Sequence, residues 1–160
     1  MGNGQAERLC CLNASVTLPI VGKLNVTGRP LRTGVGIGLA TGKHAVCFVG
    51  GGGSLFSIHA LWTAAKYAIP SIFVCFVNHE YRLLKDLWCQ GMGATIDTTR
   101  FVGMDFDDPK LDMRGIASGF GARMDRIDKI SAIDDVLDRA LTHRGPSFPI
   151  LSFPILDREP

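Results

Sequence analysis

The sequence predicts an α/β protein with three α-β-α layers around a mainly parallel sheet. Two compact apolar runs, at residues 44–49 and 71–77, are typical of strands that are buried on both faces. Between them, residues 55–68 carry apolar side chains, Trp62 among them, at the three- and four-residue spacings of a helix with one buried face. Strands and helices that alternate in this way imply a parallel sheet covered by helices.

The N-terminal part gives a weaker pattern. Residues 1–33 contain glycine and proline punctuation and no sustained period, so we expect an irregular segment there. A short helix is expected over residues 35–41. The α/β domain is then expected to extend over residues 34–153, with a C-terminal tail at 154–160.

The second half continues the alternation. Glycines and a proline predict a loop over residues 89–111. Residues 113–120 are expected to form a helix between Asp112 as N-cap and Gly121 as the C-terminal stop, followed by a strand at 122–127.

The last two elements are a helix and a strand. Ser131 and Asp134 resemble a capping box, which predicts a helix over residues 131–144. Residues 147–153 are expected to form the last strand. Pro149 removes a hydrogen-bond donor from this strand, which favours an edge position or a local distortion.

The composition excludes several classes of protein. The net charge of +2 is too small to imply a nucleic-acid partner, and the longest strongly apolar run, IFVCFV, is too short to cross a membrane. The five cysteines are odd in number and form no C-x-x-C pair. This cysteine pattern predicts a reducing compartment, and we expect a cytoplasmic protein.

Two loops follow the two central strands. Four consecutive glycines, Gly50 to Gly53, end the first strand, and the polar residues 78–81 end the second. Because the carboxyl ends of parallel strands share one edge of the sheet, where ligands bind in such folds, the loops predict one site. Consecutive glycines let the backbone approach a ligand, often a phosphate, although a tight turn without a ligand remains an alternative.

Common glycine-rich and catalytic motifs do not match this loop. A nucleotide P-loop requires Lys-Ser/Thr after its glycines, whereas Gly53 is followed by SLFSI. A dinucleotide fingerprint requires a further glycine in the helix and an acidic residue after the second strand, where this chain has Asn78. Ser54 lacks the frame of a nucleophile elbow, and the four histidines show no ligand spacing.

The segment VCFVGGGGSLFSIHALWTAAKYAIPSIFVCFVNHEYRLLKDLW resembles the diphosphate-binding segment of thiamine diphosphate enzymes, nearest to the benzoylformate decarboxylase and acetolactate synthase group. Residues 50–52 stand where the family has Gly-Asp-Gly, and Val77-Asn78 stand where it has an Asn pair. The segment GMDFDDPKLDMRGIASGFGARMDRI resembles the same group. The resemblance covers roughly residues 34–153 and implies the thiamine diphosphate-binding fold.

The resemblance implies thiamine diphosphate and Mg²⁺ as cofactors and decarboxylation or carboligation of a 2-oxo acid as the activity. The metal ligands that it implies in this chain are the side chain of Asn78 and the backbone carbonyl of Glu80. The cofactor-binding residues that it implies are Gly50, Gly51, Gly52, Gly53, Ser54, Asn78, Glu80 and Tyr81.

The chain departs from the family in two ways. Gly51 has no carboxylate where the family has the metal-binding Asp, and Val77 replaces the first Asn of the pair. The family's catalytic glutamate lies on a separate pyrimidine-binding domain, so no catalytic residue is named here and we expect this chain alone to be inactive.

Three explanations stay open. In the first, the chain is one subunit of a homo- or hetero-oligomer in which a pyrimidine-binding partner acts in trans. In the second, it is a degenerate remnant with little cofactor affinity. In the third, it is a scaffolding module.

Overall fold

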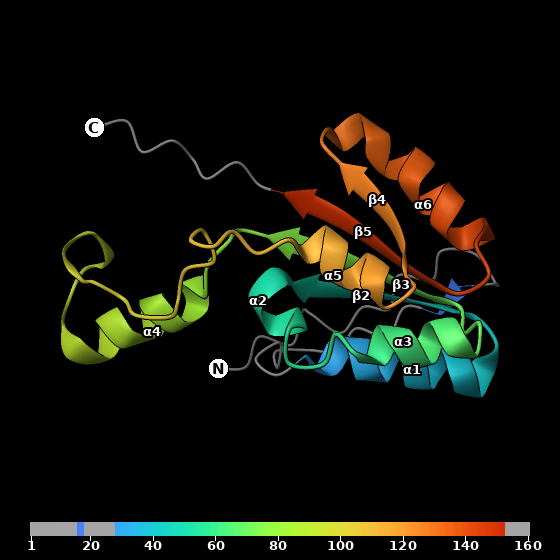
Figure 1. Cartoon of the computed structure of the whole chain (residues 1–160), viewed down its shortest axis with the longest axis horizontal. Coiled ribbons are helices and arrows are strands. Elements are labelled where there is room, and N and C mark those ends of the chain that lie inside the picture. Colours follow the sequence, from blue (N-terminus) through green and yellow to red (C-terminus); the bar gives the residue numbers. More distant parts are fainter. Residues whose placement is uncertain (1–15, 18–27, 153–160) are drawn as a thin grey trace, which may run out of the picture.

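The protein is built on one parallel sheet. The structure, a computed structural model, describes residues 16–17 and 28–152 (Figure 1). Five strands pair in the order β1-β2-β3-β5-β4, and every pairing is parallel. The α/β prediction is thereby confirmed. The strands are β1 Val16–Thr17, β2 His44–Gly50, β3 Ser71–Val77, β4 Arg123–Ile127 and β5 Pro146–Ser152.

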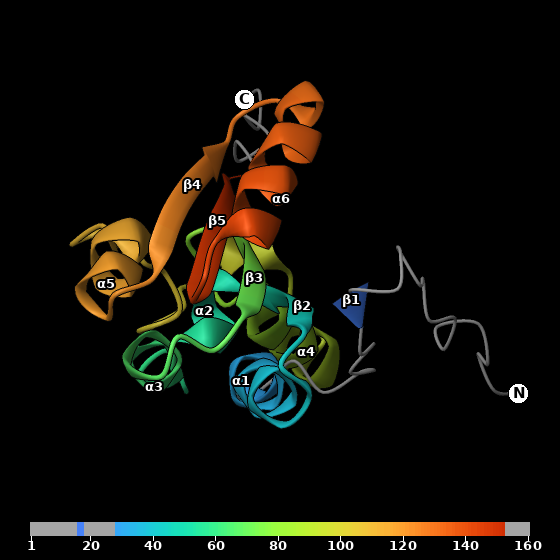
Figure 2. The ribbon, with the colours of Figure 1, turned by 90° about the vertical axis from the view of Figure 1, so that its right-hand side faces the viewer.

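Helices cover both faces of the sheet, giving the three expected layers. Figure 2 shows α3 (Ala60–Lys66) and α5 (Met113–Gly119) on one side and α6 (Ile133–Thr142) on the other. The helix α1 (Arg29–Thr41) shares with α3 and α5 a buried core built around Phe73 and Phe148. On the opposite face, Ala140 of α6 packs on Ile72 and Val74 of β3. A further helix, α4 (Arg82–Met92), lies beyond the carboxyl ends of the strands (Figure 1).

The first helix is longer than the sequence predicted. Instead of beginning at residue 35, α1 begins at Arg29, so residues 29–33 are helical and not irregular. Pro30 lies in the first turn, where its missing N–H needs no partner, so the proline starts the helix. A Cβ at Gly34 would lie 2.7 Å from the Phe73 ring, and this glycine therefore allows α1 to pack closely on β3.

The helix predicted over residues 55–68 is interrupted. A short helix, α2 (Gly51–Ser54), follows β2 directly, turns occupy residues 55–59, and α3 begins only at Ala60. Ile58 and Leu61 are buried as expected, but Trp62 is 54% exposed, so its assignment to the core was wrong. The Lys66 ammonium lies 4.9 Å from the Trp62 ring centroid, which gives the exposed ring a cationic neighbour.

The loop predicted over residues 89–111 contains the end of α4. That helix continues to Met92 and stops at Gly93, whose φ of 64° is left-handed. Gly91 was interpreted as loop punctuation, but it lies inside the helix, where a Cβ would meet no atom within 4 Å. A 3₁₀ helix, η2 (Ile96–Thr98), follows in the predicted loop.

The elements after residue 111 agree better with the sequence. Asp112 caps α5 as predicted, because its Oδ1 accepts a hydrogen bond of 3.0 Å from the backbone N–H of Gly115. The capping box at α6 was wrong: Ser131 lies in the 3₁₀ helix η3 (Ile130–Ala132), and the N-cap position is occupied by Ala132. A residue inside a preceding turn cannot cap the helix that follows.

The strand β5 is central, so of the two outcomes expected from Pro149 the edge position does not occur. It lies between β3 and β4. Between the pairs Ile72–Ser147 and Cys75–Ile150, β5 has no paired residues on β3. The ladder is therefore interrupted at Pro149, which has no N–H to donate. The expected distortion is therefore present, and it lets a proline occupy an internal strand.

Residues 1–15, 18–27 and 153–160, with the expectations placed on them, lie outside the described part of the chain. No helix within the described ranges is long and apolar enough to cross a membrane.

Candidate functional site

The two loops predicted to form a site do lie together. β2 and β3 pair in parallel, and Gly50 at the end of β2 is paired with Phe76 near the end of β3. The glycine loop and the loop after β3 therefore leave the sheet at the same edge. They enclose a cavity of about 420 Å³, lined by Gly50, Gly51, Gly52, Gly53, Phe56, Asn78, Glu80, Tyr81, Arg82, Leu83, Leu84 and Asp86.

The glycines differ in what their surroundings would tolerate. A Cβ at Gly52 would lie 2.6 Å from the Tyr81 ring and 3.2 Å from that of Phe106, so this position must remain glycine. A Cβ at Gly51 would meet its nearest atom, Cγ2 of Val77, at an ordinary contact distance of 3.5 Å. Packing therefore does not require glycine at position 51, where the family has its aspartate.

Ser54 is not brought to the cavity. Its side chain is fully buried, and its hydroxyl donates a hydrogen bond of 2.7 Å to the carbonyl oxygen of Gly51. The hydroxyl thus holds the glycine loop in its own conformation. Whether the loop binds a cofactor there stays a prediction.

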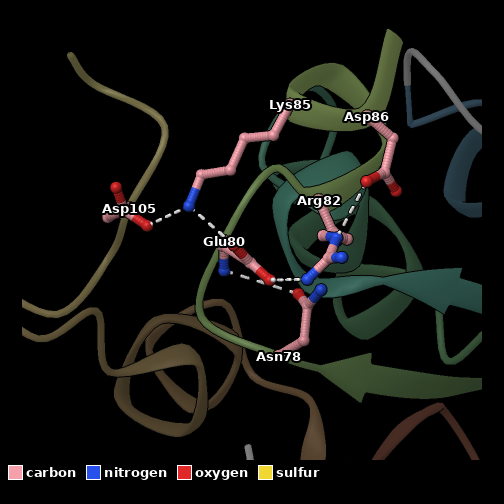
Figure 3. Close-up of polar contacts among 6 residues, drawn as sticks. All are labelled: Asn78, Glu80, Arg82, Lys85, Asp86 and Asp105. Atoms are coloured by element: carbon pink, nitrogen blue, oxygen red, sulfur yellow. Dashed lines mark hydrogen bonds and ion pairs between the residues drawn. The ribbon is translucent and has the colours of Figure 1, made fainter. Parts of the chain in front are cut away.

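The loop after β3 holds Asn78 and Glu80 close together. The Asn78 side-chain oxygen accepts a hydrogen bond of 3.4 Å from the backbone N–H of Glu80 (Figure 3). The loop is fixed from outside by the segment around Asp105, since the Tyr81 N–H donates to the Met104 carbonyl and the Phe106 N–H to the His79 carbonyl, both at 2.8 Å. His79 has a left-handed φ of 56° in this loop.

The Glu80 carboxylate is paired with a buried lysine. Nζ of Lys85 lies 2.6 Å from Oε2 of Glu80 and also contacts Asp105. Burial lowers the pKa of Lys85, but the hydrogen bonds to Asp105 and Glu80 outweigh it and raise that pKa above its usual value. The lysine therefore stays charged and ties the cavity loop to the segment around Asp105. The sequence analysis did not predict this contact.

Arg82 was also missed. It is the one cation among the described residues that line the cavity. Its Nε donates a hydrogen bond of 3.0 Å to Oδ1 of Asp86, and its Nη1 lies 3.6 Å from Oε1 of Glu80. Figure 3 shows the guanidinium between these two carboxylates. The signal for Arg82 in the sequence was its place four residues before Asp86, directly after the polar loop.

The described donors are a poor match for Mg²⁺, which prefers several hard oxygen ligands in near-octahedral geometry. Gly51 supplies no carboxylate, and the oxygen of Asn78 is engaged by a backbone N–H. Across residues 16–17 and 28–152, no group of three His, Cys, Asp or Glu side chains is placed to hold a metal ion. Metal ligation by Asn78 and Glu80 stays a prediction.

Comparison with known proteins gives the same picture of the domain. The family model for the thiamine pyrophosphate enzyme, C-terminal TPP binding domain, matches residues 13–149. The chain belongs to this family. The matched range contains the glycine loop, the loop after β3 and the beginning of β5.

Relatives of this thiamine pyrophosphate family are similar to the chain at moderate identity. Benzoylformate decarboxylase of Pseudomonas aeruginosa is 31% identical over 120 residues, which are 74% of this chain and 21% of that protein. A candidate acetolactate synthase large subunit of Mycobacterium tuberculosis is 26% identical over 120 residues, 74% of this chain and 23% of that protein.

A solved structure agrees. The thiamine diphosphate-dependent 4-hydroxybenzoylformate decarboxylase of Rhodococcus jostii has a TM-score of 0.67 at 25% identity, over 80% of this chain and 24% of that one. The chain thus spans about a fifth of the length of the relatives that it matches.

Proposed function

We propose that this chain is the diphosphate-binding domain or subunit of a thiamine diphosphate-dependent 2-oxo acid decarboxylase or carboligase. The observation that carries the proposal is that the glycine loop and the loop after β3 line one and the same cavity. Its volume of about 420 Å³ is in the range of small-molecule sites, and aromatic and leucine side chains line part of it.

The residues of the chain would bind and orient the cofactor. Glycines at 50, 51 and 53 leave main-chain N–H groups open to diphosphate oxygens. Gly52 allows the Tyr81 ring to close the cavity, and Phe106 supports that ring edge-on with 4.7 Å between the centroids. When bound, thiamine diphosphate supplies the electron sink that decarboxylation of a 2-oxo acid requires.

A partner in trans completes this proposal. The relatives are four to five times longer than the matched part, which supports a role for a pyrimidine-binding domain or subunit besides this domain. Exposed apolar side chains border the cavity and continue along α4, which supports a homo- or hetero-oligomer: Phe56, Leu83, Leu87, Trp88 and Met92. The cysteine pattern supports a cytoplasmic location.

The alternative is a degenerate, non-catalytic remnant or scaffolding module. Gly51 favours it, because the family's metal-binding carboxylate is missing although a Cβ at this position would meet its neighbours at ordinary contact distances. Under this alternative the fold persists while cofactor affinity is weak or lost.

Titration calorimetry of the full chain with thiamine diphosphate distinguishes the two, with Mg²⁺ present throughout. The proposal predicts saturable heat with thiamine diphosphate and much weaker heat with thiamine, which lacks the diphosphate. Equal responses to the two ligands, or no heat from either, would favour the remnant. The same titration in the presence of a pyrimidine-binding domain tests whether a partner acts in trans. We expect the partner to increase the affinity for thiamine diphosphate.

A further inference from the structure

We propose that the cavity holds a diphosphate group without a divalent metal, and that the Arg82 guanidinium supplies the positive charge. The inference rests on the proposed function, because it concerns the same cavity and the same ligand. It departs from the family's use of Mg²⁺, and it is carried by contacts of this chain.

The first step is the missing ligand at Gly51. A metal that bridges a diphosphate to the protein needs an anionic protein ligand to be held firmly. The two carboxylates that line the cavity, those of Glu80 and Asp86, are both paired with cations of the protein. A diphosphate in this cavity therefore needs its positive charge from another source.

The second step is the position of Arg82. It lies at the beginning of α4 and lines the same cavity as the four glycines. A guanidinium has five N–H donors in a planar fork that matches phosphate oxygens, which makes arginine a preferred residue for binding phosphates. The two carboxylate contacts occupy only part of this fork.

The third step is that Arg82 is free to turn toward a ligand. Its contact with Asp86 is a pair spaced by four residues on a helix, with both side chains about half exposed, and such pairs are weak. Glu80 has a much closer partner in Lys85, at 2.6 Å against 3.6 Å for Arg82. A phosphate with more than one negative charge would compete well for the guanidinium.

The fourth step concerns Asp86. Its carboxylate lines the cavity and would repel a diphosphate while it competes for Arg82. Removing this charge should therefore strengthen binding, which is the opposite of the effect expected if Asp86 helped to hold a metal.

The test measures binding of inorganic pyrophosphate and of thiamine diphosphate to the full chain by calorimetry, once in EDTA and once in Mg²⁺. The chain without substitutions is expected to bind both ligands in EDTA. Its affinity for each ligand in Mg²⁺ should differ from that in EDTA by less than about twofold. Arg82→Gln should weaken binding by about tenfold or more, the loss of a charge-assisted contact. The affinity of Arg82→Lys should lie between those of the original chain and Arg82→Gln, because lysine keeps the positive charge but lacks the planar fork of N–H donors.

Two further variants serve as controls. Asp86→Asn should tighten pyrophosphate binding severalfold. Arg126→Gln removes an exposed arginine on β4, paired with Asp128 away from the cavity, and should leave both affinities within about twofold. Thermal melting of each variant checks that the fold is intact.

The outcomes separate this inference from the proposed function. Binding of thiamine diphosphate only with Mg²⁺, unaffected by Arg82→Gln, would overturn the inference and leave the proposed function standing. Metal-independent binding of pyrophosphate through Arg82, without binding of thiamine diphosphate, would support the inference and remove the proposed cofactor. No binding of either ligand under either condition would overturn both.

Discussion

Gly51 is the residue at which a single substitution can test the ligand chemistry of the cavity. A Cβ at this position would lie at an ordinary contact distance of 3.5 Å from its nearest neighbour beyond the adjacent residues, so packing does not exclude the first atom of a side chain there. We expect Gly51→Asp to make thiamine diphosphate binding respond to Mg²⁺, with affinity at least about fivefold higher with the metal than in EDTA, because a carboxylate is a preferred Mg²⁺ ligand. Calorimetry in both conditions measures the change.

The matched control is Gly51→Asn, which has nearly the same shape and no charge. It should not gain the response to Mg²⁺. An equal response from the two variants would show that the added volume, and not the carboxylate, changed the cavity.

Gly52 presents the opposite case, because its surroundings exclude a side chain. Gly52→Ala forces the added Cβ against the Tyr81 ring at 2.6 Å, so the ring must move or the loop must shift. We expect a loss of about 1–3 kcal/mol in the free energy of unfolding, typical of overpacking. Urea denaturation followed by tryptophan fluorescence measures it.

Gly50→Ala is the control for Gly52→Ala, since a Cβ at Gly50 meets no atom within 4 Å. Its effect on stability should be much smaller. Equal losses from both variants would mean that backbone entropy, and not the contact with Tyr81, decides the stability of the loop.

Residues of the site were predictable where their position in the chain alone determined their position in the fold. The glycine loop and Asn78 each directly follow a strand, so the parallel sheet alone brings them to one edge. Lys85 and His79 were missed because their contacts involve a segment twenty or more residues away along the chain, around Asp105. Arg82 was missed because its role depends on the direction of its side chain. A sequence pattern contains no such directions.

Among the elements, α4 depends on one buried charge. Lys85 is 5% exposed and bridges Glu80 to Asp105, so it joins the helix to the segment that follows it. We expect Lys85→Met to lower the free energy of unfolding by about 1–2 kcal/mol, less than for a fully buried pair because Asp105 is half exposed. Urea denaturation measures the loss.

A second readout shows whether the loss is local. Hydrogen exchange in Lys85→Met should rise in residues 99–107 before it rises in β3. Arg126→Gln, which removes an exposed pair, should change stability by less than about 0.5 kcal/mol. If Lys85→Met does no more than Arg126→Gln, the bridge adds nothing to the stability of the loop.

Elements were predicted best where burial determines the pattern. β2 and β3 are continuous apolar runs inside the sheet, and their bounds agree with the prediction to within one residue. The expectation that both are buried on both faces was wrong for β2, where Phe48 is 59% exposed. α4 was missed because much of its apolar surface faces solvent, so its pattern does not indicate a core helix. Pro149 predicted an edge position or a local distortion for β5, and the sequence could not decide between them; the structure has the distortion, with β5 inside the sheet.

At the scale of the whole molecule, the fold class followed from the alternation of elements, but the strand order did not. β5 inserts between β3 and β4, and this depends on which faces of the sheet the helices cover. The cavity at the carboxyl edge was predictable without the full strand order, because β2 and β3 are neighbours both along the chain and in the sheet. The site was thus more predictable than the topology around it.

The apolar face of α4 gives the last prediction. Leu87 is 54% exposed there and lies between Leu83 at the cavity and Met92 at the end of the helix. Exposed large apolar side chains on one helix are typical of an interface, so we expect the chain to associate as its concentration rises in sedimentation velocity runs. Leu87→Asp should weaken that association by about tenfold, because it places a charge in the desolvated centre of the contact.

Leu39→Asp is the matched control for Leu87→Asp, since Leu39 is 67% exposed and lies on α1 and not on α4. It should leave the association unchanged, and neither residue lines the cavity, so ligand binding provides a check on the fold. A chain that sediments as a monomer at every concentration, or an equal effect of both substitutions, would rule out self-association through α4. Because α4 borders the cavity, a confirmed interface would place the ligand beside a second copy of the chain, where neighbouring residues could complete the site.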